Sequence, residues 1–206
     1  MEFNQVIKAR RSIRKFKPEP IPEAFIQEII DAGRLAPSVS NIQSTRYVII
    51  KNAEMKEKLI EYTLPLVKSA PLVIVCCVYK KAWLDMEERL TQLTNLGAFS
   101  DIYEETRKQM ENYEKNGKMG RVMSAQIADY YLWQHAAIAI DHMTLKAVDL
   151  GLGSCWVGFV DRAKVKELLG LDDNYEVVAL LPIGYPDQNP PPRPRLAVGD
   201  IVVKEF

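Results

Sequence analysis

The chain has 206 residues, 48% of them hydrophobic, and its 27 basic and 27 acidic side chains leave no net charge. This length suits one sizeable domain or two small ones, and the apolar share is enough for a core. The charge balance provides no overall basic field, which argues against nucleic acid or a membrane surface as a partner. Residues 1–12 contain no apolar leader, and no run reaches the roughly 18–20 apolar residues of a membrane span, so we expect a cytoplasmic protein.

In the first half of the chain, helices and strands are predicted to alternate. The expected elements are helices over 2–10, 21–38 and 52–70, and strands over 44–52 and 71–79. Pro22 suits the first turn of the second helix, and Pro37 marks its end. Asn52 suits the N-cap of the third helix. The second strand is an apolar run that holds Cys76 and Cys77, and with one further cysteine the chain has no disulfide framework.

The second half is dominated by one long apolar helix. Amphipathic helices broken near Gly97 are expected in 80–120, followed by helices over 124–150 and 161–171, and Asp161 is expected to cap the last of these. Strands are expected over 153–160, 175–185 and 200–206. The long helix is apolar around much of its girth and should be buried in a core or at a subunit interface. Prolines keep 186–200 irregular. Without repeats or a Ser/Gly linker, we expect one α+β domain over 1–206, with a helical insertion at about 80–120 and a C-terminal extension at about 186–206.

A basic cluster, RRSIR, follows the first helix at residues 10–14. Arginine guanidinium groups present paired donors that match phosphate oxygens, and Ser12 adds a hydroxyl. In an extended segment Arg10, Ser12 and Arg14 would point the same way. A solvated basic turn, or a stretch similar to a nuclear import signal, explains this cluster equally well.

Polar side chains crowd the segment between the second helix and the first strand. Ser38 and Ser40 carry hydroxyls, and Asn41 and Gln43 carry amides. Amide side chains offer donor and acceptor together, which suits a ring with imide and carbonyl groups. An ordinary helix-to-strand loop has the same composition, so both interpretations stay open.

The segment LGLGSCWVG, residues 150–158, is not a dinucleotide-binding fingerprint, because Trp156 replaces the last glycine and the segment follows a helix and opens a strand. Its glycines let another group approach the backbone closely. Cys155 is a candidate nucleophile, but neither His135 nor His142 has a spacing that predicts a pair with it. The two histidines make a poor metal site, and we interpret them as packed or interface residues.

Two arginines, Arg193 and Arg195, stand on a proline-rich backbone in PPPRPR. A stiff segment of this kind loses little entropy on ordering, so it can present both side chains to a ligand at low cost. The alternative is a recognition tail of the P-x-x-P kind, which Pro191 to Pro194 would satisfy.

In this order, RRSIRKF, LAPSVSNIQSTRYVII, GLGSCWVG and IGYPDQNPPPRPR resemble the FMN-dependent nitroreductase family, over about 3–81 and about 124–206. The resemblance implies an α+β homodimer with a mostly antiparallel sheet packed among helices. C-terminal extensions would wrap the partner, and two FMN sites would lie at the interface. It also implies hydride transfer from NADH or NADPH through flavin N5 to a small oxidised acceptor, such as a nitroaromatic, a quinone or another flavin.

By motif match, all four segments would contribute to flavin binding. The residues for the phosphate, ribityl chain and pyrimidine edge are Arg10, Arg11, Ser12 and Arg14. Those expected mostly from the other subunit are Pro37, Ser38, Val39, Ser40, Asn41 and Gln43. Those beside the isoalloxazine ring are Cys155, Trp156, Val157 and Gly158, and Arg193 and Arg195 would return to the phosphate. Arg14 is the candidate to stabilise reduced flavin, which is anionic near N1 and O2.

The chain departs from the pattern at one point. The family often has Gln-Pro-Trp-Arg-Phe where this chain has Gln-Ser-Thr-Arg-Tyr at 43–47, which affects the nearby pocket. The insertion is expected to set substrate identity. Its aromatic residues Trp83, Phe99, Tyr103 and Tyr113 would either cover the flavin face or pack inward in a surface helical pair.

Two alternatives to this function stay open. The same fold could support reductive dehalogenation or cleavage of the flavin itself. The chain could also be a flavin-binding or Pro-rich interaction protein without turnover, an interpretation based mainly on PPPRPR.

Overall fold

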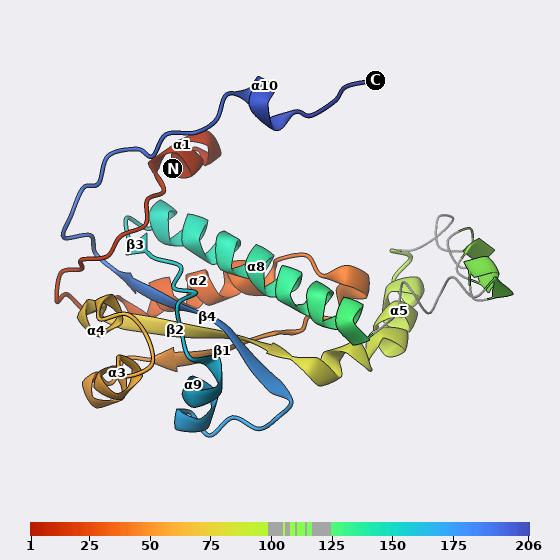
Figure 1. Ribbon diagram of the computed structural model, residues 1–206, viewed down its shortest axis with the longest axis horizontal. Helices are drawn as coiled ribbons and strands as arrows, with labels where there is room; N and C mark the ends of the chain where they lie inside the picture. The colour runs from red at the N-terminus through yellow and green to blue at the C-terminus, as the bar shows by residue number, and fades with distance from the viewer. Residues whose placement is uncertain (99–104, 106–107, 110, 114, 117–124) are drawn as a thin grey trace.

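A computed structural model describes residues 1–98, 105, 108–109, 111–113, 115–116 and 125–206 (Figure 1). A four-stranded antiparallel sheet lies at the centre, in the order β1-β2-β4-β3. The strands are β1 (Thr45–Ile50), β2 (Leu72–Tyr79), β3 (Gly153–Ser154) and β4 (Tyr175–Gly184). The predicted α+β fold with an antiparallel sheet among helices is therefore confirmed.

Helices cover both faces of the sheet (Figure 1). On one face α2 (Glu23–Arg34) packs against α8 (Ala125–Asp149). On the other face lie α3 (Ala53–Leu59), α4 (Leu66–Ser69) and α9 (Arg162–Leu168). The remaining helices are α1 (Phe3–Ala9), the short 3-10 helices η1 (Val39–Asn41) and η2 (Lys80–Trp83), α5 (Met86–Asn95) and α10 (Val198–Ile201). None of the described helices is long and apolar enough to cross a lipid bilayer.

The central strand β2 is buried on both faces, which explains its continuous apolar run. Successive side chains of a strand point to opposite faces. Ile74 and Cys76 accordingly join the core below α2 and α8, whereas Val73, Val75 and Cys77 join the core on the α3 and α9 side. The sheet with a core on each face gives the fold three layers. All three cysteines of the chain are buried and form no disulfide.

Local signals predicted several element ends correctly. The side chains of Asn52 and Asp161 accept from the backbone N–H of the third helical residue at 3.0 and 3.1 Å, so both are N-caps. Helix α5 stops at a turn in which Gly97 has φ +70, a conformation that glycine adopts without strain.

Of the residues expected in and after the insertion, Phe99 and Tyr103 lie outside the described residues, and so does Ser124 before α8. Trp83 is partly buried and stacks on Tyr131 of α8 with ring centroids 6.0 Å apart.

Three predicted elements are wrong in extent. The helix expected over 52–70 is split into α3 and α4, with Pro65, which cannot donate a backbone hydrogen bond, at the start of α4. The strand expected over 153–160 is continuous only to Ser154. Cys155 and Val157 still donate their backbone N–H groups to Pro182 and Leu180 of β4, but the pairing is reduced to an isolated bridge at Val157, and Val160 bridges Thr63 instead. The strand expected over 200–206 is absent: α10 ends at Ile201, and the following residues have no neighbouring strand to pair with.

Candidate functional site

The basic segment after α1 runs alongside the glycine-rich segment after α8. Ile13 donates its backbone N–H to the carbonyl of Ser154 at 2.9 Å, and Ser12 forms a parallel bridge with Ser154. This approach needs the absence of a side chain at Gly153, where a Cβ would lie 2.5 Å from Cγ1 of Ile13. Two segments separated by about 140 positions therefore share one edge of the sheet, and two of the four predicted site segments are neighbours.

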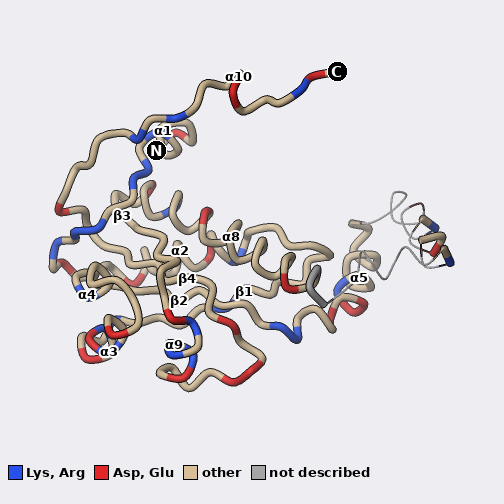
Figure 2. Tube along the Cα trace, in the orientation of Figure 1, with Lys and Arg blue, Asp and Glu red and all other residues tan. Residues whose placement is uncertain are grey.

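The same edge carries a basic hollow of about 550 Å³. Its lining comes from α1, the segment after it and the proline-rich segment, and consists of Ile7, Lys8, Arg10, Arg11, Ser12, Pro190, Pro191, Pro192, Arg193 and Arg195. Figure 2 shows the two basic segments side by side next to α1. Five of the lining side chains are cations, and none is a carboxylate. The hollow thus brings the first and fourth predicted segments together around one basic volume.

The arginines of the hollow have their donors directed at main-chain oxygens and not at carboxylates. Arg11 donates to the carbonyls of Lys8 and Arg10 at 2.6 and 2.8 Å, and Arg195 donates to that of Pro194 at 3.0 Å. Among the described residues, no ion pair involves Arg10, Arg11, Arg193 or Arg195. Their charges are uncompensated within the described chain, which favours a bound phosphate group.

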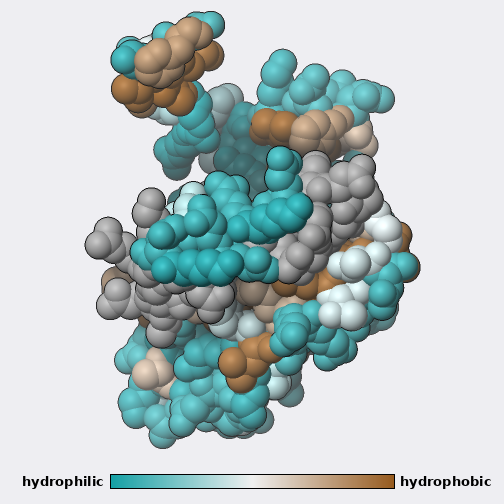
Figure 3. All heavy atoms as spheres, turned by 90° about the vertical axis from the view of Figure 1, so that its right-hand side faces the viewer, coloured by the Kyte–Doolittle hydropathy of each residue, from teal (hydrophilic) through white to brown (hydrophobic). Residues whose placement is uncertain are grey.

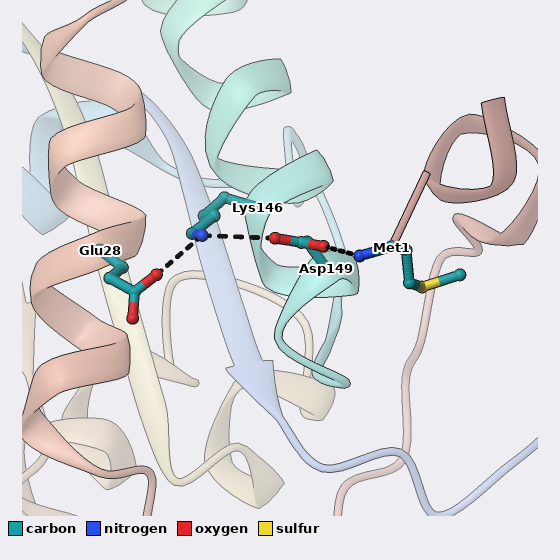
Figure 4. A network of polar contacts seen from close by, with 4 residues as sticks. All are labelled: Met1, Glu28, Lys146 and Asp149. Carbon is teal, nitrogen blue, oxygen red and sulfur yellow. Dashed lines mark hydrogen bonds and ion pairs between the residues drawn. The ribbon is translucent and has the colours of Figure 1, made fainter. Parts of the chain in front are cut away.

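An ion-pair network holds α1 against the helices beside the hollow (Figure 4). Lys146 on α8 contacts Glu28 on α2 at 2.7 Å and Asp149 at 3.3 Å, and Asp149 also contacts the N-terminal amine of Met1. The pairing with Glu28 raises the pKa of Lys146, and the pairing with the N-terminal amine lowers the pKa of Asp149. The network fixes the end of α1 relative to α8, and α1 supplies Ile7 and Lys8 to the hollow.

An apolar surface adjoins the basic segments. After Ser154 the chain passes through buried Cys155 and then exposes Trp156 by 43% and Phe159 by 76%. A Cβ at Gly158 would meet nothing within 4 Å, so this position is open. A flat aromatic ligand would bury these side chains, which suits the predicted ring contacts.

Cys155 has the properties of a packed residue. Burial raises the pKa of its thiol, and the charge of nearby Arg14 opposes that rise only in part. A thiol is a weak nucleophile until it is ionised, so a neutral buried thiol is poorly suited to covalent catalysis. Arg14 itself is exposed, and its Nη1 donates only to the carbonyl of Ser12, at 3.3 Å. The guanidinium is therefore available to a ligand beside Cys155.

The polar segment between α2 and β1, residues 37–43, lies apart from the basic hollow and borders a hollow of its own. It has an unusual backbone, because Ser40, Asn41 and Gln43 have φ of 48, 53 and 48°, in the left-handed region that non-glycine residues rarely adopt. The hydroxyl of Ser38 accepts from the backbone N–H of Gln43 at 3.0 Å, which closes the loop. Strained backbone of this kind is concentrated at ligand-binding sites. We call residues 37–43 the polar loop.

The polar loop borders a hollow of about 210 Å³. The lining residues are Ile30, Gly33, Arg34, Ala36, Pro37, Ser38, Gln43, Thr45, Arg46, Tyr47 and His135. Thr45 occupies the place where the family pattern often has Trp. The polar loop lies against His135, whereas the ion pair of Asp149 with Met1 marks the end of α8 next to α1. His135 and Asp149 are fourteen residues apart on α8, which corresponds to about 20 Å along the helix axis. A single protomer thus places the polar loop apart from the basic hollow.

His135 was predicted as a packed residue, and the structure confirms it, with 4% of its surface exposed. It also makes contacts that the sequence did not indicate. The backbone N–H of Val39 donates to its Nε2 at 2.9 Å, and its Nδ1 lies 3.1 Å from the hydroxyl of Ser44. No spacing rule could have found this pairing, because one partner is a backbone group 96 positions away.

Comparison with known proteins identifies the group to which this fold and site belong. A model of the nitroreductase family matches residues 7–185. The chain belongs to the nitroreductase family. It is similar to the NADH dehydrogenase of Thermus thermophilus, with 28% identity over 200 residues that cover 94% of this chain and 91% of that protein.

Solved structures of nitroreductase-family members have the same fold. A nitroreductase family protein from Streptococcus pneumoniae superposes with a TM-score of 0.76 at 25% identity, over 99% of this chain and all of that one. The NADPH:FMN oxidoreductase of Vibrio harveyi, solved with NAD+, gives a TM-score of 0.74 at 26% identity, over 99% of this chain and 77% of that one. The nitroreductase fold is therefore shared across almost the whole chain.

Proposed function

We propose that this protein is an FMN-dependent oxidoreductase that takes reducing equivalents from NADH or NADPH and passes them to a small oxidised acceptor, such as a nitroaromatic, a quinone or a flavin. The observation that carries the proposal is the basic hollow, in which five cations face one volume without a carboxylate. The relatives support the donor and the cofactor, since their names are NADH dehydrogenase and NADPH:FMN oxidoreductase.

The described residues fit FMN in charge and in shape. Arg10, Arg11, Arg193 and Arg195 would hold the phosphate, because guanidinium groups bind phosphate oxygens through paired, charge-assisted hydrogen bonds. Ser12 would bind the ribityl chain, one position before the segment pairs with β3. The flat ring would lie over the segment from Cys155 to Gly158, where Trp156 is exposed and Gly158 leaves open space.

When bound, FMN would supply the hydride chemistry at its N5. The protein then has to bind, orient and shield, and it needs no acid–base pair. Arg14 would place a positive charge at the pyrimidine edge, where negative charge develops on reduction. Cys155 would pack beneath the ring as a neutral thiol, since burial raises its pKa.

We infer that the functional unit is a homodimer. The polar loop and the basic hollow lie at different places along α8, so one protomer would not surround a single flavin with all four segments. The C-terminal tail also exposes many apolar side chains, namely Leu196, Val198, Ile201, Val202, Val203 and Phe206. Figures 1 and 3 show this apolar tail standing clear of the body. A partner subunit that receives the tail and offers its polar loop accounts for both features.

The first test is spectroscopic. The purified protein should be yellow, should bind FMN, and should bleach when NADH or NADPH is added without oxygen. A colourless protein that binds no added FMN would refute the proposal. A yellow protein that neither nucleotide reduces would favour a flavin-binding role without this turnover.

The second test removes the phosphate contacts. The double variant Arg10→Ala/Arg195→Ala should weaken FMN binding by about 100-fold, since each charge-assisted hydrogen bond contributes at least about 1.5 kcal/mol. The matched control, Lys58→Ala/Lys164→Ala, removes the same charge from exposed ion pairs outside the hollow and should leave the affinity unchanged. A loss of less than about twofold in the arginine variant would contradict the phosphate assignment.

The proline-rich segment, residues 190–195, forms one side of the basic hollow. Pro190, Pro191 and Pro192 line the basic hollow together with the arginines they carry into it. The segment therefore serves to position cations, and this favours the enzyme over a Pro-rich interaction protein.

A further inference from the structure

His135 on the long helix α8 contacts the polar loop through Nε2 and the following residue, Ser44, through Nδ1. Because Nε2 accepts the N–H of Val39, it carries no proton, and the proton of the neutral ring lies on Nδ1, which donates to the Ser44 hydroxyl. Ser44 is fully buried and stands where the family pattern often has a proline, which could not accept this bond. The ring orientation is therefore determined on both sides.

This contact ties the loop to α8 by a hydrogen bond, while η1 also packs against α5. Among the described hydrogen bonds of residues 38–41, the one that Val39 donates to His135 leads out of the loop. The others join residues of the loop to one another. Two loop residues, Ser40 and Asn41, have left-handed backbone, a conformation that persists only where surrounding contacts hold it. Ile42 anchors the far end in the core. The Val39–His135 bond is thus the polar attachment of the segment that carries the hydroxyl and amide groups.

We propose that His135 is a positioning residue for flavin binding, which fixes the polar loop through Val39 and releases it when its Nε2 takes up a proton. The inference rests on the proposed function, because that function places the polar loop against the flavin of the partner subunit. An imidazolium donates from both nitrogens, so the protonated ring has no acceptor for the Val39 N–H. Flavin affinity should therefore decrease on the acid side.

The surroundings of His135 set the direction of this effect. Burial lowers the pKa of His135 from its ordinary value near 6.5, so the ring is neutral at pH 7 and above. The charged groups that share its hollow are Arg34 on α2, which pairs with Asp31, and Arg46 on β1, and the phenol of Tyr47 is the other titratable group. Loop release should accordingly begin below about pH 6.5.

The test compares FMN affinity across pH in three proteins. In His135→Gln, the side-chain oxygen can accept from Val39 and does not titrate, so binding at pH 8 should stay within about threefold of the wild type. The FMN phosphate itself titrates near pH 6 and weakens binding in every protein, so the measure is the difference in slope. Between pH 8 and pH 5.5 the wild type should lose more affinity than His135→Gln, by a factor of at most about ten, because a group with a pKa below 6.5 is at most about nine-tenths protonated at pH 5.5.

The control is His142→Gln, which changes the other histidine of the same helix. His142 is half-buried and lies outside the hollow of the polar loop, so this variant should keep the wild-type slope. A third variant, His135→Leu, removes the acceptor and should lose about tenfold in affinity already at pH 8. If His135→Leu fails to fold, the comparison of the wild type with His135→Gln across pH still tests the role of His135.

A second readout does not involve flavin. Amide hydrogen exchange of the peptide over 37–44 should be faster in the wild type than in His135→Gln at pH 5.5, and equal in the two at pH 8. Equal pH slopes of FMN affinity, or equal exchange at both pH values, would overturn the role of His135. A wild type that binds no FMN would overturn the proposed function as well, so the two failures can be told apart.

Discussion

The packing of Gly153 against Ile13 supports a quantitative prediction, because it holds the basic segment on the sheet. In Gly153→Ala the new Cβ would lie 2.5 Å from Cγ1 and 2.8 Å from Cβ of Ile13, whereas ordinary contacts begin at 3.4 Å. The two side chains would have to separate by about 0.9 Å. Ile13 is branched at Cβ and buried, so a rotamer change offers little relief. The segment itself must move.

Such overpacking costs about 1–3 kcal/mol in a well-packed core. For a chain of this length, each kcal/mol lowers the melting temperature by about 2–4 °C, so we expect a decrease of about 2–12 °C. The shift also disturbs the hydrogen bond from Ile13 to Ser154, and the neighbouring Ser12 and Arg14 move away from Cys155. FMN affinity should therefore fall together with stability.

The assay is a thermal melt of the flavin-free protein, followed by an FMN titration. If Gly153→Ala melts within about 1 °C of the wild type, the close packing of the basic segment on β3 is wrong.

Three further predictions concern polar groups. The buried hydroxyl of Tyr47 has no hydrogen-bond partner among the described residues, so Tyr47→Phe should keep or raise the melting temperature, by up to about 4 °C, and a clear decrease would show that the hydroxyl has a partner. Ser44→Ala leaves Nδ1 of His135 without an acceptor and should cost about 1–2 kcal/mol in a denaturant titration, whereas no cost would contradict the pairing. Lys146→Ala removes two partly exposed ion pairs, so its cost should be below about 1 kcal/mol and should shrink at high salt. A large, salt-independent cost for Lys146→Ala would point to packing and not to charge.

The fold could be predicted wherever a local pattern decides the structure. Strand β2 was evident from an apolar run that is buried on both faces, and Asn52 and Asp161 were evident as caps because their partners lie three residues away. Two of the three errors concern strand pairing, and the third is the break at Pro65 within the helix expected over 52–70. Residues 155–160 have the composition of a strand but keep only an isolated bridge to β4 at Val157 and one to Thr63 at Val160, and residues 202–206 pair with none of the described strands.

For the candidate site, the sequence by itself determined the chemistry of the four segments and, through their order, the family. Only the tertiary structure decided which of them meet: it joins Arg10 and Arg11 to Arg193 and Arg195, and it places the polar loop elsewhere. It alone also showed the role of His135, whose partner is a backbone N–H. The physical reason is that residue type limits what a group can bind, whereas its partners depend on contacts between distant segments that no local pattern records.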